Sequence, residues 1–187
     1  MKRFTLCIIF LVVSLFTINP TVVLAKNNTY TIGPGDEIEI SVWKDESLTR
    51  RLVVPPDGVI AFPLIGDLDV TKLTVSQLRM IISKKIKEYV MDATVTVMLV
   101  NANSMRAYVV GKVNKPGLYP ITMETNVMQM LAMAGDLNAF ASPGNIIILR
   151  QEEGKPKKLP FDYDDVKRGK SLEQNIALKR GDVVVVP

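Results

Sequence analysis

The sequence lacks the side chains on which many enzymes and metal centres depend. It contains no histidine, and its one cysteine, Cys7, lies in an apolar run close to the N-terminus. Histidine titrates near neutral pH, and cysteine and histidine form most zinc sites and many nucleophile–base pairs. These chemistries are excluded from the remainder of the chain, which also has no pair of cysteines for a disulfide. We expect no catalytic residue, no metal and no cofactor.

The sequence also has no large excess of charge of one sign. The 23 basic residues nearly balance the 19 acidic ones, and aromatic residues make up only 6% of the chain. Nucleic-acid surfaces gather Lys and Arg with stacking aromatics, whereas the basic residues here are scattered. We expect no nucleic-acid partner.

Carboxylates remain as candidates for chemistry, but their pattern does not favour catalysis. Glu37 and Glu39 fall on the same polar side of a predicted strand, whereas a glycosidase needs two carboxylates that face each other. Asp162, Asp164 and Asp165 resemble part of a calcium loop that lacks its glycine and its final glutamate. A helix that starts with acidic residues explains this cluster more simply.

The first 25 residues have the features of a secretory signal peptide. Lys2 and Arg3 form a positive start, residues 4–18 are uncharged and mostly apolar, and the small residue Ala25 closes the segment before Lys26. We predict cleavage between Ala25 and Lys26.

Two alternatives exist for this segment. A retained anchor helix is disfavoured because Asn19-Pro20 interrupts the run before it reaches the ~20 apolar residues that a span needs. A lipoprotein signal would place its cysteine at the end of the run, whereas Cys7 lies at the beginning. We therefore expect a cleaved, non-lipidated signal.

A turn and an alternating strand open the chain that remains. Gly33-Pro34-Gly35-Asp36 combines glycines free to adopt positive φ, a fixed proline φ and an aspartate that can accept bonds from nearby amides. Apolar and polar residues then alternate over 37–42, which predicts a half-buried strand. Trp43 breaks the alternation, and we expect it to pack at the strand end.

The next segments predict a hairpin. Residues 44–50 are polar and indicate a loop. Strands are expected over 51–54 and 59–62, joined at Pro56-Asp57-Gly58, since Asp-Gly between apolar runs favours a tight turn. Gly66 starts another turn into a short strand.

Thr74 begins a predicted amphipathic helix. Thr74 and Gln77 have the spacing of a capping box. One apolar stripe follows at three- and four-residue steps: Val75, Leu78, Ile81, Ile82, Ile86 and Tyr89. A half-buried helix is favoured over a membrane-surface helix because neighbouring strands can cover this stripe. A strand over 94–100 and a polar linker over 101–105 follow.

The second half of the chain repeats this plan. Strands are predicted over 107–113, 118–121, 145–150, 159–161 and 183–186. Turns are expected at Pro116-Gly117 and Gly181-Asp182. Thr125 or Asn126 caps a short helix that Gly135 ends.

Two ordered sets of residues resemble the domains of one family. The first resembles the N-terminal domain of the polysaccharide export family, which serves capsule and exopolysaccharide translocons; it comprises Gly33, Pro34, Gly35, Asp36, Trp43, Pro56, Asp57, Gly58 and Gly66. The second resembles the soluble-ligand-binding β-grasp (SLBB) domain that follows it; it comprises Gly111, Pro116, Gly117, Gly135, Gly181 and Asp182. The resemblance implies an α+β chain: an export domain over 26–102, with a mixed sheet and one helix, and a β-grasp-like domain over 103–187.

The resemblance implies export without catalysis. In the family such domains form rings around a periplasmic conduit, so the implied partners are copies of this chain, the polysaccharide, a separate outer-membrane component and an inner-membrane polysaccharide co-polymerase. Larger members carry an acylated cysteine and a C-terminal amphipathic helix, which this sequence lacks up to Pro187. We expect a periplasmic ring associated with the outer membrane through another protein. The alternative is a monomeric periplasmic module that binds a saccharide or another small ligand. The polymer-contacting residues cannot be assigned from the sequence.

Overall fold

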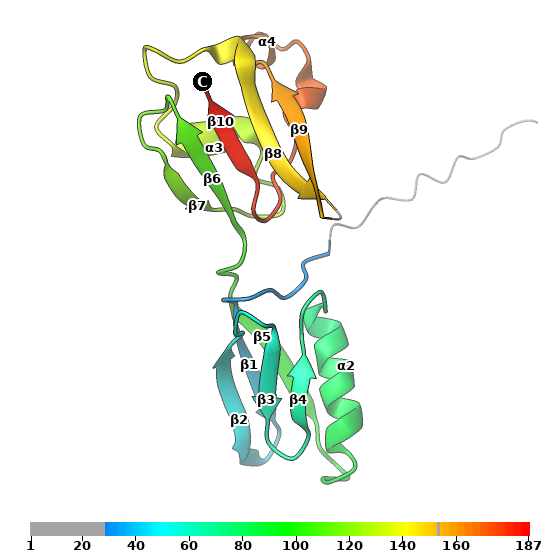
Figure 1. Cartoon of the computed structure of the whole chain (residues 1–187). Coiled ribbons are helices and arrows are strands. Elements are labelled where there is room, and N and C mark those ends of the chain that lie inside the picture. The colour runs from blue at the N-terminus through cyan, green and yellow to red at the C-terminus, as the bar shows by residue number, and fades with distance from the viewer. Residues whose placement is uncertain (1–28, 153) are drawn as a thin grey trace, which may run out of the picture.

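Two units, each with its own hydrophobic core, make up the described chain (Figure 1). The structure is a computed structural model and describes residues 29–152 and 154–187. Both units combine sheets with few helices, which confirms the predicted α+β class. The predicted signal peptide and its cleavage site at Ala25 and Lys26 lie outside the described residues.

In the N-terminal unit, a hairpin and a helix cover one face of a three-stranded antiparallel sheet. The sheet has the order β2-β1-β5, formed by β1 (Glu37–Val42), β2 (Asp45–Val53) and β5 (Val95–Asn101). The covering elements are the hairpin of β3 (Val59–Phe62) with β4 (Gly66–Asp69) and the helix α2 (Val75–Ile86). Ile38 and Ile40 of β1 point into the core with Leu78 and Ile82 of α2, as their spacing predicts.

Helix α2 begins at the predicted capping box. The Thr74 hydroxyl accepts a bond from the Gln77 amide, and the Gln77 side chain accepts one from the Thr74 amide. The helix ends at Ile86, so Tyr89, which we placed on its apolar stripe, lies beyond it and is exposed.

Three local predictions in this unit are wrong. Residues 45–50, predicted as a loop, belong to β2, an edge strand in which only Leu48 is buried, so that its sequence is mostly polar. The strand over 59–62 pairs with β4 rather than with β2, because Pro55-Pro56 cannot extend a hydrogen-bonded ladder between the two. Trp43 is 71% exposed, since alternation after the buried Val42 directs it to the solvent side.

The C-terminal unit is built on a five-stranded mixed sheet of order β7-β6-β10-β8-β9. Its strands are β6 (Arg106–Gly111), β7 (Gly117–Pro120), β8 (Ile146–Glu152), β9 (Lys155–Phe161) and β10 (Val183–Val186). Strands β10 and β6 run parallel, and the other neighbours are antiparallel. The last strand of the chain therefore lies in the centre of the sheet.

Short helices cover one face of this sheet, with α3 behind it in the view of Figure 1. These helices are α3 (Val127–Met133), η2 (Pro143–Asn145), α4 (Tyr163–Lys167) and η3 (Leu172–Gln174). Asn126 caps α3 in a capping box with Gln129, and Gly135 follows its end with φ of +75°. Val127, Met130 and Leu131 are fully buried against the sheet. The opposite face of the sheet has no such cover among the described residues.

Candidate functional site at the domain junction and the open sheet face

Two turns of the same geometry lie where the units meet. In the first Gly–Asp turn (Gly33–Asp36), the Gly33 amide donates to Asp36 Oδ2 (2.7 Å) and the Asp36 amide donates to the Gly33 carbonyl (3.1 Å). In the second Gly–Asp turn (179–182), the Lys179 amide donates to Asp182 Oδ2 (2.8 Å) and the Asp182 amide to the Lys179 carbonyl (3.1 Å). The third residues, Gly35 and Gly181, have φ of +87° and +80°, a conformation that favours glycine.

Asp36 is fully buried and links both units. Besides Gly33, its carboxylate accepts bonds from the hydroxyl of Tyr30 and, at 2.8 Å, from the amide of Ser104. Ser104 belongs to the linker between β5 and β6, and its hydroxyl lies 3.1 Å from that of Tyr30. Burial, and then the bond to Asp36, raise the pKa of the Tyr30 hydroxyl to about 12. Tyr30 therefore stays a neutral donor at physiological pH.

Asp182 is also fully buried, but its partner is a cation from its own unit. The guanidinium of Arg150 on β8 forms an ion pair with it, with Nη2 at 2.6 Å and Nε at 3.0 Å from the two carboxylate oxygens. Arg150 also donates to the Ala177 carbonyl (2.9 Å). This pair fixes the loop before β10 to β8, inside the C-terminal unit.

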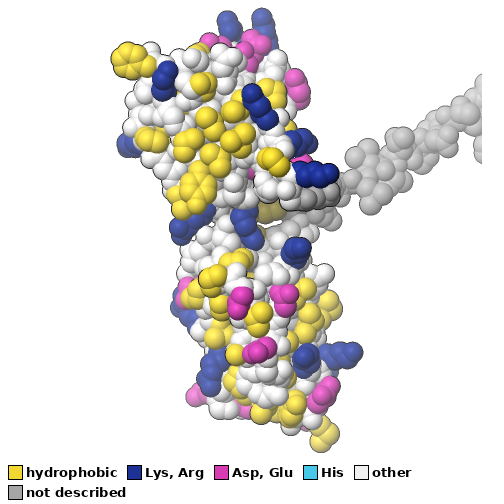
Figure 2. All heavy atoms as spheres, in the orientation of Figure 1, with side chains coloured by type: hydrophobic (Ala, Val, Ile, Leu, Met, Phe, Trp, Pro, Cys, Tyr) yellow, Lys and Arg dark blue, Asp and Glu magenta, His cyan; other side chains and the backbone are white. Residues whose placement is uncertain are grey.

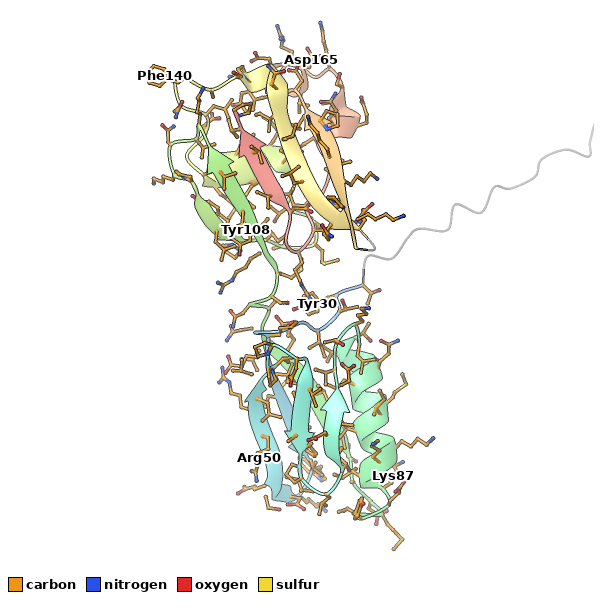
Figure 3. All side chains as sticks on the ribbon, in the orientation of Figure 1. Tyr30, Arg50, Lys87, Tyr108, Phe140 and Asp165 are labelled. Carbon is orange, nitrogen blue, oxygen red and sulfur yellow. The ribbon has the colours of Figure 1, made fainter. Side chains whose placement is uncertain are left out.

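The two turns contact each other through Arg180. Its Nη2 donates to the Thr31 carbonyl (2.7 Å), and its guanidinium lies 5.8 Å from the centre of the Tyr30 ring. Gly33 lies so close that a Cβ there would stand 2.0 Å from Arg180 Nη1. Figure 3 shows Tyr30 between the units, where these groups meet. Every buried side-chain nitrogen or oxygen in the described part of the chain has a hydrogen-bond partner.

A pocket of about 400 Å³ adjoins this junction. Residues 29–31, Met105, Met123 and residues 177–180 line it. Its lining combines methionine side chains with Tyr30 and the cationic Lys179 and Arg180. Lys179 is already paired with Glu152 (2.8 Å), and Arg180 with the Thr31 carbonyl. The pocket can hold a small ligand, but it presents no catalytic constellation.

The second candidate feature is the uncovered face of the C-terminal sheet, which we call the open sheet face. It consists of Tyr108, Val110, Leu118, Leu149, Val183 and Val185. The strand register brings them into adjacent rows, because Tyr108 pairs with Leu118 and Val183, and Val183 with Leu149. The first four are 40–46% exposed. Figure 2 shows the resulting apolar area on the upper unit. Contiguous exposed apolar area of this kind is typical of interaction surfaces.

The other motif residues lie in turns around both units. Pro56, Asp57 and Gly58 connect β2 to β3, with Asp57 Oδ1 accepting from the Val59 amide (3.1 Å), and Gly66 starts β4. Pro34 lies inside the first Gly–Asp turn. Pro116 and Gly117 lead into β7. Gly111 ends β6 with φ of +95°, where a Cβ would stand 2.0 Å from the Val186 carbonyl oxygen.

Two of the carboxylates considered for catalysis, Glu37 and Asp162, have structural partners. Glu37 accepts bonds from Arg51 and Asn101 (both 2.6 Å), and these bonds, that from Arg51 first, lower its pKa. Asp162 caps α4 by accepting from the Asp165 amide (2.9 Å), so the acidic cluster is a helix start. Residues 29–152 and 154–187 contain no group of three or more side chains arranged to hold a metal ion.

The sequence did not indicate the roles of Tyr30, Ser104 and Arg150. It also did not indicate that Arg180 contacts Tyr30 and Thr31. For Arg150 a signal existed, because Ile146, Ile148 and Arg150 alternate onto the buried face of β8. A cation at such a position requires a buried anion. For Tyr30 and Ser104 no pattern was available, since their contacts depend on how the units meet.

These observations define a class of protein: two small α+β domains fixed at a hydrogen-bonded junction, with an exposed apolar face on one of them. None of the helices in the described part of the chain is both long and apolar enough to cross a membrane.

Comparison with known proteins identifies the family. Residues 24–100 match the model of the polysaccharide biosynthesis/export protein family, and residues 105–186 match the SLBB domain model. The chain belongs to the polysaccharide export family, with an export domain followed by one SLBB domain.

Curated relatives agree with this assignment. The polysialic acid transport protein KpsD of Escherichia coli is 32% identical over 60% of this chain and 20% of its own length. The EPS I polysaccharide export outer membrane protein EpsA of Ralstonia nicotianae is 29% identical, over 87% of this chain and 48% of the relative. The capsule polysaccharide export outer membrane protein CtrA of Neisseria meningitidis is 23% identical, over 85% of this chain and 44% of the relative. The chain thus spans between a fifth and about half of these relatives.

Proposed function

We propose that this protein is a periplasmic component of a capsule or exopolysaccharide export apparatus, in which copies form an oligomeric ring through which polymer passes to the outer membrane. The observation that carries the proposal is the order of the two family matches, export domain and then SLBB domain, over residues 24–100 and 105–186. We take residues 26–102 and 103–187 as the functional units. Cleavage between Ala25 and Lys26 would release the chain into the periplasm.

In this proposal the protein acts by contact rather than by catalysis. The buried carboxylates of the two turns are both paired, Asp36 with the linker amide of Ser104 and Asp182 with Arg150 of its own domain, so in this proposal they hold the structure rather than react. The partners are the polysaccharide, a separate outer-membrane component and an inner-membrane polysaccharide co-polymerase. The relatives named for polysialic acid, EPS I and capsule polysaccharide support a polymer as cargo.

Deletion of the gene and complementation with the full chain test the proposal. We expect surface polymer to be lost in the deletion strain and restored by the complement, while sugar-precursor pools stay at their normal level. Unchanged surface polymer, in a strain without a duplicate export protein, would contradict the export role.

A second candidate is a monomeric module that binds a saccharide or another small ligand. The pocket of about 400 Å³ at the junction favours it, because its size and its mixed lining are those of a small-ligand site. A monomeric mass at all concentrations, together with saturable binding of a short saccharide, would favour this candidate over the ring.

A further inference from the structure

We propose that the end of the export domain remote from the SLBB domain docks on a phospholipid bilayer, into whose interface three turns insert their apolar side chains. These turns carry Trp43, Leu64, Tyr89 and Met91, which we call the distal tip. The inference goes beyond the export role and does not depend on it. It follows from the position, the exposure, the backbone conformation and the residue types of the distal tip.

The strand connections place the distal tip at one end of the domain. Residues 43–44 connect β1 to β2, residues 63–65 connect β3 to β4, and residues 87–94 connect α2 to β5. Figure 1 shows all three connections at the lower end of the export domain, and Figure 3 labels Lys87 there. The Trp43 amide donates to the Thr94 carbonyl (2.9 Å), so the first and third connections are in direct contact.

The four side chains are exposed although their types favour burial. The exposed fractions are 71% for Trp43, 51% for Leu64, 60% for Tyr89 and 88% for Met91. Trp43 and Tyr89 are aromatic residues that the sequence pattern predicted to pack on the domain, yet both lie outside its core. Packing within the described chain therefore does not account for these residue types.

Two residues of the turns also have an unfavourable backbone conformation. Lys44 has φ of +62° and Leu64 has φ of +68°. Glycine or asparagine adopts this left-handed region at lower cost than leucine does. At 51% exposure, Leu64 recovers little of that cost by packing. Conformational strain of this kind is typical of functional segments, and an apolar contact outside the chain would offset it.

The size and shape of the distal tip favour lipid over a protein partner. Since a whole large side chain presents about 150–250 Å², the four expose roughly 500 Å² together. A standard protein interface covers about 800 Å² on each partner. Separate protruding turns can each insert a side chain into a fluid interface without a matching surface. Trp and Tyr are the residues enriched where a bilayer meets water.

The charges beside the distal tip do not select anionic lipid. The three connections and the adjoining ends of β2, β4 and α2 contain four lysines and five carboxylates: Lys44, Lys84, Lys85, Lys87, Asp45, Glu46, Asp67, Glu88 and Asp92. Lysine stems can lie along an apolar surface while their charged ends stay in water or among headgroups. Because the charges are nearly balanced, we expect insertion that depends little on salt or on headgroup charge.

Trp43 reports on the distal tip directly, because it is the only tryptophan in the chain. The full mature chain, purified from the periplasm, would be titrated with vesicles of phosphatidylcholine, alone or mixed with phosphatidylglycerol. We expect the Trp43 emission to shift to the blue with both kinds of vesicle, at low salt and at about 0.5 M NaCl. Lipids brominated along their acyl chains should quench this emission.

Met91→Asp should lower the affinity for vesicles about tenfold, because it replaces an inserted apolar side chain with a charge. Met91 is 88% exposed, so the unfolding midpoint should stay at the wild-type value. The matched control is Phe140→Asp. Phe140 is 80% exposed but lies at the far end of the SLBB domain (Figure 3), so this change should leave vesicle binding unaltered.

Leu64→Asn separates lipid binding from fold stability. Asparagine tolerates the left-handed conformation better than leucine, so the unfolding midpoint should stay equal or rise. The affinity for vesicles should nevertheless fall at least about threefold, since an apolar side chain is lost. Wild-type affinity in this variant would exclude Leu64 from the contact and contradict insertion of all three turns.

Three further results would overturn the proposal. Emission that does not shift at millimolar lipid would show that the distal tip has no affinity for a bilayer, and would leave a protein partner as its occupant. Binding that requires phosphatidylglycerol and is lost in salt would be charge adsorption rather than insertion. Vesicle binding without a shift of Trp43 would place the contact on another surface. None of these results bears on the export role, which deletion and complementation test separately.

Discussion

The two Gly–Asp turns show how one local design can serve two purposes. Both use an aspartate that accepts its own turn amide three residues back, and both place glycine at positive φ before that aspartate. They differ in the additional partners that bind the aspartate carboxylate. Asp182 receives a cation from β8 of its own domain, whereas Asp36 receives neutral donors from the N-terminal segment and from the linker. The second turn closes a domain, and the first joins two domains.

This difference has an energetic meaning. A buried ion pair is costly to break, because removal of one partner leaves an uncompensated charge in the core. A carboxylate held by neutral donors loses less when it becomes neutral, since each bond contributes only about 0.5–3 kcal/mol. We therefore expect the second turn to limit the stability of the SLBB domain, and the first to set how firmly the domains are held together.

The largest effect is predicted for Arg150→Met. This change removes the cation and leaves Asp182 buried, so we expect the unfolding free energy of the C-terminal domain to fall by about 3–5 kcal/mol. Urea denaturation followed by circular dichroism measures it. The control is Lys157→Met, which removes the exposed pair with Glu152 and should cost less than ~1 kcal/mol. Equal effects of the two changes would contradict the role of the buried pair.

Asp36→Asn comes next. The amide keeps the shape but loses the charge that strengthens the bonds from Gly33, Tyr30 and Ser104, so we expect a loss of about 1–3 kcal/mol. Because two of these donors lie outside β1 and its turn, limited proteolysis of the 102–105 linker should also become faster. Asp57→Asn, in an exposed turn, is the control. Unchanged proteolysis would show that Asp36 does not hold the linker.

Gly33→Ala should have a smaller effect. The new Cβ meets the end of the Arg180 side chain, which can move aside at the loss of its bond to the Thr31 carbonyl, so we expect less than ~1 kcal/mol. The equivalent position of the second turn is Lys179, so a side chain is compatible with the turn itself. In an Arg180→Ala background the substitution should cost nothing further, as a double-mutant cycle would measure. A full cost in that background would place the strain in the turn.

A pH dependence is predicted from Tyr30. Its pKa of about 12 in the folded protein lies above the ordinary value of 10.0, so the folded state holds this proton more tightly. Its contribution to stability is complete below pH 10 and is lost as the pH rises towards 12. The difference in unfolding free energy between wild type and Tyr30→Phe should therefore shrink from pH 9 to pH 12. A constant or growing difference would contradict the burial of the Tyr30 hydroxyl and its bond to Asp36.

The sequence predicted local structure where the relevant contacts are local. The capping box at Thr74 and Gln77 and the alternation along β1 depend on neighbours a few residues away, and the structure agrees with them. The strand at 45–50 was missed because an edge strand needs little apolar sequence. The pairing of β3 was wrong because the Asp57-Gly58 signal gives a turn but not the partner of the strand.

The candidate sites were less accessible to sequence reasoning. Each aspartate was placed in its turn, yet the partners Tyr30, Ser104 and Arg150 lie 6, 68 and 32 residues away. The open sheet face emerges only from strand order, because Val183 acquires Tyr108 and Leu149 as neighbours when β10 inserts between β6 and β8. Long-range register of this kind is not encoded in any short pattern.

The central claim is that polymer in transit contacts this protein. Cells that make the polymer from labelled sugar would be crosslinked during a pulse and after a chase, and the chain would be purified under denaturing conditions. We predict label on the chain that rises in the pulse and falls in the chase as surface polymer accumulates. Label no higher than on an unrelated periplasmic protein, or label that does not chase, would contradict a role as a conduit.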